Sequence, residues 1–515
     1  MRKKQYKIFA AIHLGSEMIS MQIVQYRNLN NMKVLEECNR RVRLGEETFK
    51  NKIIPFSMVN EICELLVGFK RLMTEYEVEE YSMQATTAVR EALNRVFLLD
   101  QIYIRTGLKV TVIDLPEEIY TKYASIRRTM KLDGLTGVDE SMLMMDISSG
   151  GLGITFVKDN IIRYQQNLNI GVIRVKESFN RNQRSSMKFN QALAEYLSST
   201  MGAVRDALKN EQIHYLVLTG AESELLLQMM GVEFKAGVIR IKTEQFMQLF
   251  KTVHELNLPQ IIKVFKINED VAELVVPTIL LYEQLLALVP VQEIILTDDR
   301  FIDGICLLHI GPKASKDYAD ELEQEQLSLL YSIGERYQYD EAHSRQVAKL
   351  ALAMFDKLGK HHGLDSHILL QATALLHDIG KYVSLRSHSL YSYMLIMSCD
   401  ILGFSEMDKK IVALASYYHA HRLFSGKRHA EVEEMSPEII PLVAKIAALV
   451  RLADAMDRSY KQKIKSCRVN VKNGVMKVEA VTFEDLTIEE WTFASKASFF
   501  EEVYGLQAVL ERVDR

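Results

Sequence analysis

The chain has 515 residues, of which 48% are hydrophobic and 25% are charged, and its formal net charge is −4. This length and composition predict three or four globular domains with ample hydrophobic core. The slightly acidic balance argues against a protein that coats a nucleic-acid duplex, because phosphate backbones bind basic surfaces.

One pattern of strands occurs twice in the first half of the chain. Residues 6–12 and 19–25 are two mainly apolar segments on either side of a short turn, which predicts a β-hairpin. A second set of strands is predicted at 141–146, 152–157 and 161–166. The repetition predicts two similar α/β lobes that face each other across a cleft.

The most apolar long segment, residues 274–291, contains Pro277 and Glu283. Because a bilayer span needs about 20 nearly uninterrupted apolar residues, this segment predicts a buried helix, and we expect no contact with a membrane. The five cysteines form no Cys-x-x-Cys pair, which favours free thiols and a cytoplasmic location.

The pattern becomes helical from Asp340 onward, and nine of the thirteen histidines lie between His343 and His429. Asp340 can cap the first of these helices. Further along, Asn473 and Gly474 form a strong two-residue hairpin signal between two alternating segments. The helices are therefore expected to be followed by a small α+β cap.

Four side chains in the helical region suit a metal site. His343 shares a helix face with the apolar Val347, and the adjacent His377 and Asp378 follow an apolar run in which a charged carboxylate needs a partner. Asp454 lies on the apolar face of a later helix. Three helices thus point nitrogen and oxygen donors inward, a set for which we favour Mg²⁺ or Mn²⁺, with Fe²⁺, Ni²⁺ and Zn²⁺ as alternatives.

A lone buried histidine is more often a hydrogen-bonded core residue than a ligand, but the ordered set favours a metal. His388 and His419 could hold a second ion, and Lys381 and Arg422 are candidate phosphate clamps. A bound divalent ion lowers the pKa of its water towards ~7 and so supplies hydroxide at neutral pH.

The order of His343, the His377–Asp378 pair and Asp454 resembles the HD phosphohydrolase superfamily. This resemblance implies that these four residues bind a divalent metal and that the domain hydrolyses phosphate esters.

Two turns in the N-terminal half have the composition of phosphate-binding loops. The first contains Gly15 and Ser16, and the second contains Asp146, Gly150 and Gly151. Small residues let backbone N–H groups approach phosphate oxygens. Plain structural turns are the alternative interpretation.

A third candidate phosphate contact follows the strand at residues 81–85. Thr87 can donate a hydrogen bond to phosphate, and Arg90 can bind it in a bidentate manner. An ordinary helix start capped by threonine is the alternative.

Six segments occur in the order typical of one known family. They are Ala10–Ser16, Ala85–Ala92 with Asn94, Ile113–Ile119, Asp146–Gly151, Gly171 with Arg174, and Thr219–Gly220. With them the chain resembles, over nearly its whole length, the exopolyphosphatase/guanosine pentaphosphate phosphatase family, several members of which also carry a C-terminal HD-type domain.

The resemblance implies an actin-like (ribonuclease H-like) fold and removal of the terminal phosphate from polyphosphate or guanosine pentaphosphate. It also implies that a glutamate activates water with the help of Mg²⁺, a role that falls on Glu117 or Glu118, and a homodimer is compatible with the family.

The chain departs from the family at both phosphate loops. The first loop of the family has an aspartate where this chain has His13, and Asn-Ser where it has Glu17 and Met18. The second loop runs on to Ser-Thr-Glu where this chain has residues 151–153, Gly-Leu-Gly. Glu17 brings a negative charge towards the phosphate, and two like charges ~4 Å apart cost about 4 kcal/mol at an effective dielectric of 20.

The expected architecture is an actin-like α/β half, an all-α HD domain and a small α+β C-terminal domain. We expect lobe I at 1–128, lobe II at 129–312, the HD domain at 313–465 and the cap at 466–515. The expected function is a phosphohydrolase that removes a terminal phosphate from polyphosphate or a phosphorylated nucleotide, with a metal-dependent HD domain. In the alternative, the lobes sense such a ligand without hydrolysing it and regulate the HD domain.

Overall fold

The computed structural model describes residues 6–136, 140–148, 151–177, 189–219, 221–233, 237–358, 367–421, 430, 432–433 and 435–513. The chain divides into two compact units, Met1–Glu325 (unit 1) and Gln326–Arg515 (unit 2), which are considered separately below. Among the described residues, no helix has both the length and the apolar character needed to cross a membrane.

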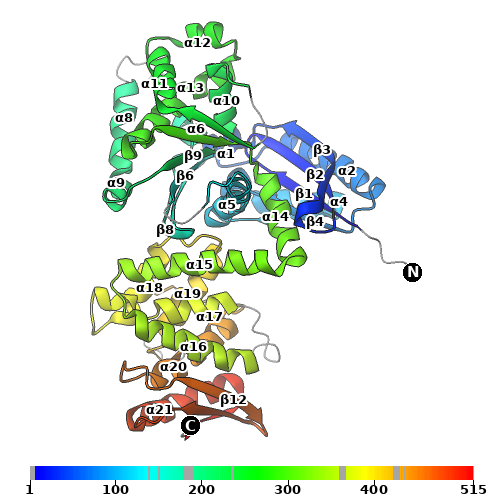
Figure 1. The fold of residues 1–515 in the computed structure, drawn as a ribbon. Coiled ribbons are helices and arrows are strands. Elements are labelled where there is room, and N and C mark those ends of the chain that lie inside the picture. The colour runs from blue at the N-terminus through cyan, green and yellow to red at the C-terminus, as the bar shows by residue number, and fades with distance from the viewer. Residues whose placement is uncertain are drawn as a thin grey trace. The chain divides into compact units, whose positions relative to one another are not determined.

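Unit 1 contains two β-sheets built on the same plan (Figure 1). In the first sheet, β1 and β2 form the predicted antiparallel hairpin, β3 extends it, and β4 and β5 add parallel strands. In the second sheet, β6, β7 and β8 form the antiparallel set, and β9 and then β11 add parallel strands. The predicted duplication is therefore confirmed. The strands are β1 Lys7–Leu14, β2 Met18–Tyr26, β3 Met32–Arg41, β4 Glu80–Ala85, β5 Thr111–Val112, β6 Ser141–Ile147, β7 Leu152–Lys158, β8 Ile161–Leu168, β9 Tyr215–Thr219, β10 Val238–Lys242 and β11 Glu293–Thr297.

Two strands of unit 1 have no counterpart in the sequence-based prediction. They are β3 and β10, and each lies at an edge of its sheet. Neither strand has the regular alternation of buried and exposed residues that a half-buried strand shows. An edge strand can be polar on both faces, so it leaves little periodic signal.

Helices cover the sheets of unit 1. The apolar segment around Pro277 forms α13, a helix with buried residues along its length, as predicted. Helix α14 packs against both α5 and β1. The helices are η1 Leu29–Asn31, α1 Leu44–Asn51, α2 Phe56–Glu75, α3 Thr87–Glu91, α4 Arg95–Thr106, α5 Leu115–Leu132, α6 Val172–Glu177, α8 Phe189–Thr200, α9 Gly202–Leu208, α10 Ala221–Met230, α11 Thr243–His254, α12 Leu258–Phe265, α13 Glu269–Leu288, α14 Phe301–Ala314 and α15 Lys316–Arg336, which crosses the boundary into unit 2.

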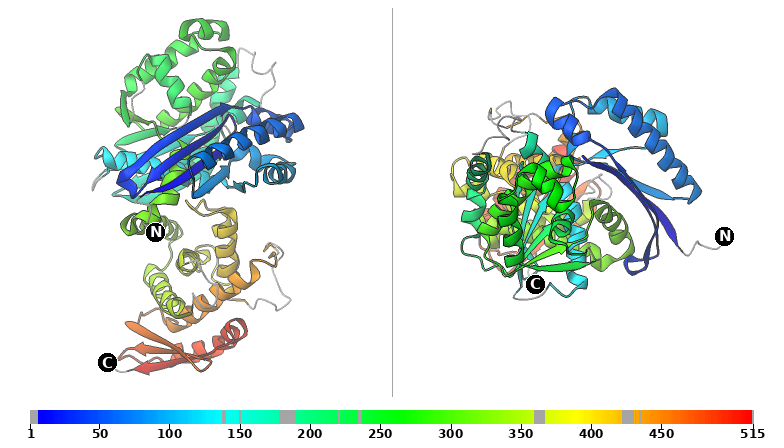
Figure 2. Two further views of the ribbon diagram at one scale, coloured as in Figure 1. Left: turned by 90° about the vertical axis from the view of Figure 1, so that its right-hand side faces the viewer. Right: turned by 90° about the horizontal axis from the view of Figure 1, so that it is seen from above.

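Unit 2 begins with a set of helices that includes those expected after Asp340 and near Asp454. A three-stranded sheet follows, with order β12-β13-β14, and β12 and β13 form the hairpin expected at Asn473 and Gly474. Figure 2 shows this sheet in orange and red together with α21, which packs on both β14 and α20. The elements are α16 Glu341–Leu358, α17 His367–Leu376, η3 Ile379–Tyr382, α18 His388–Ser398, α19 Glu406–Tyr418, α20 Ile440–Met456, β12 Ser466–Lys472, β13 Val475–Val481, α21 Thr487–Tyr504 and β14 Gln507–Val513.

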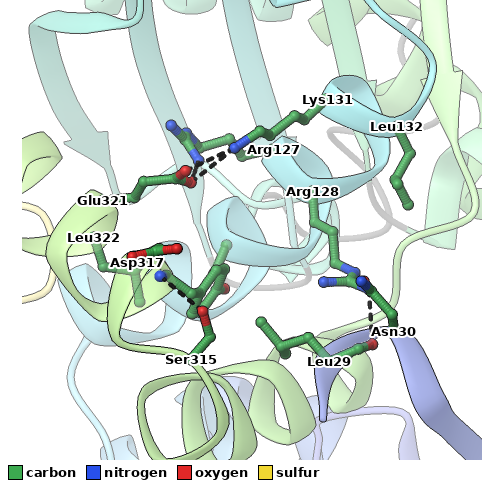
Figure 3. Close-up of a pocket in the computed structure, with 12 residues that line it drawn as sticks. Leu29, Asn30, Arg127, Arg128, Lys131, Leu132, Ser315, Asp317, Glu321 and Leu322 are labelled. Carbon is green, nitrogen blue, oxygen red and sulfur yellow. Dashed lines mark hydrogen bonds and ion pairs between the residues drawn. The ribbon is translucent and has the colours of Figure 1, made fainter.

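Helix α5, the short helix η1 and the start of α15 enclose a cavity of about 430 Å³ in unit 1. Figure 3 shows Arg127, Arg128 and Lys131 of α5 on its wall, with Glu321 of α15 facing two of them. The Glu321 carboxylate accepts from Lys131 at 2.8 and 3.0 Å and from Arg127 at 3.4 Å, and Arg128 donates to the carbonyl of Leu29 at 2.9 Å. These cationic groups therefore already have partners, and the cavity belongs to the packing between the helices.

Gly304 of α14 allows the close contact with α5. A Cβ atom at this position would lie 2.0 Å from the backbone oxygen of Thr121, which cannot move without shifting α5. We predict that Gly304→Ala lowers the free energy of unfolding by about 1–3 kcal/mol, the usual cost of overpacking. Chemical denaturation of the full chain measures the change.

The control for this prediction is Gly68→Ala, within helix α2. A Cβ atom at Gly68 would meet no atom within 4 Å, so alanine should stabilise the helix by about 0.5–1 kcal/mol. Equal stability of Gly304→Ala and the unchanged protein would show that α5 and α14 pack less closely than the structure has them.

A buried carboxyl on α15 predicts a dependence of stability on pH. Burial raises the pKa of Glu325 from its ordinary value of 4.5 to about 7, against the opposing effect of its ion pair with Arg127. An acid whose pKa rises on folding stabilises the fold fully below its unfolded pKa, and that contribution is lost as the pH rises through the folded pKa. We therefore predict a fall in the free energy of unfolding between pH 4.5 and pH 7, of about 3 kcal/mol at most.

Denaturation at several pH values tests this expectation. Glu325→Gln should flatten the fall between pH 4.5 and pH 7, because the amide does not titrate. Glu335→Gln, which changes an exposed carboxylate of the same helix, should keep it. An unchanged slope in Glu325→Gln would assign the pH dependence to other groups.

Candidate functional site

Five helical elements of unit 2 bring imidazoles and carboxylates to one interior point. We call the six predicted ligands the histidine–aspartate centre. Helix α16 supplies the first histidine, the end of α17 the His-Asp pair, the start of α18 and the end of α19 one histidine each, and α20 the second aspartate. All except His388 are buried. The residues of the centre are His343, His377, Asp378, His388, His419 and Asp454.

Asp378 lies in the middle of the centre. Its Oδ2 atom is 3.4 Å from Nε2 of His377 and 3.9 Å from Nε2 of His343. Its Oδ1 atom is 3.6 Å from Nε2 of His388 and 3.9 Å from Nε2 of His419. One carboxylate thus faces four imidazoles, two on each of its oxygens.

Five of the six donors fall into two groups that share Asp378, and Asp454 lies beside the first, with its Oδ1 atom 3.5 Å from Nε2 of His343. His343, His377 and Asp378 form one group and Asp378, His388 and His419 the other, each with its ligand atoms within 4.8 Å of one another. Two ligands that bind one ion at ~2.1 Å lie about 3–4 Å apart, so the observed spacings suit a divalent cation. The geometry accommodates the predicted first ion and the predicted second ion.

Hydrogen bonds on the outer nitrogens fix how the imidazoles face. Nδ1 of His377 donates to the carbonyl of Ala374 at 2.8 Å, and Nδ1 of His343 lies 2.9 Å from Oδ2 of Asp457. The Nε2 atoms of His343 and His377 then point inward, buried and without a hydrogen-bond partner among the described residues. Metal-binding histidines characteristically hold one nitrogen in such a bond and offer the other to the ion.

Asp457 was not predicted from the sequence. It follows Asp454 by three residues, and its carboxylate accepts from the backbone N–H of Gln462 at 2.7 Å as well as facing His343. Burial lowers the pKa of His343, but the carboxylates of Asp454, 3.5 Å from its Nε2 atom, and of Asp457, 2.9 Å from its Nδ1 atom, outweigh it and raise the pKa to about 9.

Two lysines and a tyrosine complete the charge balance. Lys381 and the hydroxyl of Tyr460, the latter at 2.8 Å, donate to Oδ2 of Asp378, and Lys496 of α21 donates to Asp454. Burial alone would raise the pKa of Asp378, but His377, His419 and Lys381 hold it below its usual range. Both carboxylates are therefore charged and compensated. Lys381 was predicted as a phosphate clamp, whereas Tyr460 and Lys496 were not predicted.

Gly380 explains how α18 comes so close to the His-Asp pair. A Cβ atom there would lie 2.0 Å from the carbonyl oxygen of His388 and 2.3 Å from the backbone nitrogen of Ser392. The backbone N–H of Gly380 instead donates to the Ser392 hydroxyl at 2.9 Å. Without a side chain at this position, the first turn of α18 can place His388 beside Asp378.

Unit 1 has its own polar cluster at the carboxyl ends of β1, β4, β6 and β9, which we call the strand-end cluster. Ligands of α/β proteins commonly bind at this edge of a sheet. Helix α5 adds two side chains four residues apart, and α3 adds two. The members are His13, Thr87, Arg90, Glu118, Lys122, Asp146 and Thr219.

The contacts of this cluster separate the two candidate glutamates. Glu118 is buried and accepts from the hydroxyl of Thr87 at 3.2 Å and from Arg90 at 3.3 Å. Glu117 instead accepts from the backbone N–H of Asp114 at 2.9 Å, within the capping box of α5. The structure therefore joins Thr87, Arg90 and Glu118 and commits Glu117 to the helix start.

The predicted phosphate loops form tight turns. The backbone N–H of Gly15 donates to the carbonyl of Met18 at 3.0 Å, and Ser16 is buried. In the second loop the N–H of Ser148 donates to the carbonyl of Gly151 at 2.9 Å. Two further predicted residues, Gly150 and Arg422, lie outside the described residues.

Comparison with known proteins gives a family for both units. The model of the Ppx/GppA phosphatase family matches residues 22–307, and that of Ppx/GppA phosphatase, domain III, matches residues 328–500. A guanosine-5'-triphosphate,3'-diphosphate pyrophosphatase of Vibrio atlanticus is 22% identical over 468 residues, which cover 88% of this chain and 89% of that protein.

Two solved structures share the fold at low sequence identity. An exopolyphosphatase from Cytophaga hutchinsonii is 19% identical in sequence with a TM-score of 0.52, and the match covers 59% of this chain and 98% of that protein's chain. The Aquifex aeolicus member of the Ppx/GppA family is 20% identical with a TM-score of 0.50 and the same coverage. They support the actin-like fold expected for the N-terminal half. Because the family model spans more than half of its residues, the chain belongs to the Ppx/GppA phosphatase family.

Proposed function

We propose that this chain is a divalent-metal-dependent phosphohydrolase that removes the terminal phosphate from polyphosphate or a phosphorylated guanosine nucleotide, with the reaction at the histidine–aspartate centre. One observation carries the proposal. The Nε2 atoms of His343 and His377 are buried, lack hydrogen-bond partners among the described residues, and lie 3.9 and 3.4 Å from Asp378. Buried polar atoms without partners are costly, and a bound cation would satisfy them.

The residues of the centre and two of their neighbours take three roles under this proposal. His343, His377, Asp378 and Asp454 would hold one ion, and His388 and His419 would share Asp378 with a second, as in the HD-type arrangement. When bound, Mg²⁺ or Mn²⁺ would activate a water molecule and stabilise the phosphoryl oxygens. Asp457 orients His343, and Lys381 places an ammonium beside Asp378, where it can hold a phosphate oxygen of the substrate.

The substrate class rests on the relatives. The Vibrio protein is named for a guanosine-5'-triphosphate,3'-diphosphate and the Cytophaga structure for exopolyphosphatase activity. Both names denote hydrolysis at a phosphoanhydride, a reaction that needs positive charge at the developing phosphate oxygens. A metal centre with a nearby ammonium meets that need.

A second candidate places hydrolysis in unit 1. It is favoured by Glu118, whose buried carboxylate lies beside Thr87 and Arg90 at the carboxyl ends of the strands. In this case Glu118 would accept a proton from the attacking water, and Arg90 and Thr87 would bind the phosphate. The two candidates use different residues, so substitutions distinguish them.

We predict that the purified full chain contains at least one equivalent of a divalent metal, and that His377→Ala and Asp378→Ala each lose it. Either change removes a donor from the group that converges on one point. Elemental analysis of the purified variants measures the content. The matched control is His367→Ala, at the opposite end of α17, which should keep the metal. Full metal content in both ligand variants would contradict the assignment of the ligands.

Hydrolysis assays on guanosine pentaphosphate and polyphosphate test where the reaction takes place. His377→Ala should lower turnover by at least about 100-fold, since a metal contributes several kcal/mol to transition-state stabilisation. Glu118→Gln serves as the test of unit 1, and Glu117→Gln, at the capping box of α5, is its matched control. If turnover persists in His377→Ala and Glu117→Gln but is lost in Glu118→Gln, the reaction takes place in unit 1.

A further inference from the structure

The strand-end cluster of unit 1 contains a cation of its own. Nζ of Lys122 lies 2.8 Å from Oδ1 of Asp146, and the hydroxyl of Thr219 donates to the same oxygen at 2.8 Å. The side chains of Lys122 and Asp146 are only 13% and 8% exposed. The single carboxylate at the end of β6 is therefore already neutralised inside the protein.

The position of Lys122 follows from the helix that carries it. It lies four residues after Glu118 on α5, so both side chains point to the same side of that helix. The adjacent parallel strands β6 and β9 bring Asp146 and Thr219 opposite each other. Lysine thus reaches the cluster from a rigid element rather than from a loop.

The cluster's second carboxylate, Glu118, is paired with Arg90 at 3.3 Å, and the remaining nitrogen donor, His13, does not suit Mg²⁺. His13 stands where the family has an aspartate, and its Nε2 atom is hydrogen-bonded to the hydroxyl of Thr86 at 3.2 Å. Burial and the nearby Lys122 lower the pKa of His13 to about 3, so the imidazole is neutral. Mg²⁺ prefers oxygen ligands with near-octahedral geometry and usually one or two carboxylates, and a neutral imidazole adds no negative charge.

The second loop also lacks a place for the missing acidic side chain. Gly153 stands where the family has glutamate, and a Cβ atom there would lie 2.6 Å from Cδ1 of Ile119. Ile119 therefore occupies the space that a longer side chain would need. Among the described residues, every group of three or more His, Cys, Asp or Glu side chains close enough to hold one metal ion lies in unit 2.

We propose that Lys122 takes the place of a divalent cation in the strand-end cluster, so that unit 1 binds the terminal phosphate of a polyphosphate chain without a metal ion. The Lys122 ammonium has three N–H donors, so it would donate to a phosphate oxygen while it offsets the charge of Asp146, and Arg90 offsets the charge of Glu118. Under this proposal unit 1 binds phosphate without a metal ion, whereas the histidine–aspartate centre of unit 2 depends on a bound divalent cation.

A titration with Mn²⁺ alone tests the absence of a metal site in unit 1. The full chain and its Asp146→Asn variant should bind the same number of Mn²⁺ equivalents by calorimetry, since Asp146 is not a metal ligand. The double variant His13→Asp with Lys122→Ala should bind one equivalent more, because it supplies a second carboxylate and removes the ammonium. Loss of one equivalent in Asp146→Asn would overturn the proposal.

Binding of inorganic tripolyphosphate in the presence of EDTA tests the role of Lys122 directly. The unchanged protein should bind, Lys122→Met should bind at least about tenfold more weakly, and Lys122→Arg should stay within about threefold, as expected for loss or retention of one charge-assisted hydrogen bond. Lys209→Met, at an exposed position, is the matched control. Binding that appears only after Mg²⁺ is added, or that is unchanged in Lys122→Met, would overturn the proposal.

Removal of Lys122 leaves Asp146 buried without its partner, so the fold of each variant needs a check. Lys122→Met combined with Asp146→Asn removes both charges, and thermal unfolding compares it with the single variants. If both the double variant and Lys122→Met are folded and bind tripolyphosphate weakly, the loss of binding is due to the missing ammonium and not to misfolding. If the folded double variant binds tripolyphosphate as tightly as the unchanged protein does, the proposal fails. The outcome is separate from that of the proposed function, which rests on the metal content of His377→Ala.

Discussion

A charged carboxylate enclosed by imidazoles is the constraint on which unit 2 depends. Asp378 is almost fully buried, and such a group is tolerated only when positive charge and hydrogen bonds surround it. Lys381 and the hydroxyl of Tyr460 donate to it, and four histidines from α16, the end of α17, α18 and α19 enclose it at 3.4–3.9 Å. The packing of these helices and the chemistry of the centre are thus set by one side chain.

Much of this centre is readable from the sequence, because helical periodicity decides which side chains point inward. His343, the pair His377–Asp378 and Asp454 each share a face with apolar residues, and the structure places them together. Lys496 could not be found this way. It reaches Asp454 from a helix that begins more than thirty residues later in the chain, and no local pattern records a contact between elements so far apart.

The same limit applies to unit 1. The buried strands and their duplication follow from apolar patterns, whereas the edge strands carry weaker signals because β3 is largely polar and β10 is only five residues long. Sequence similarity marks Glu117 and Glu118 equally, and only the hydrogen bond from Asp114 to Glu117 shows that one of them belongs to the helix cap. Lys122 likewise reads as an ordinary helix residue until Asp146 is seen beside it.

The lysines beside the two aspartates of unit 2 also bear on folding. Lys381 donates to Asp378 and Lys496 donates to Asp454, so neither carboxylate enters the interior as an unpaired charge. Lys496 comes from α21, so the C-terminal part of unit 2 contributes to the stability of the helices that carry the centre.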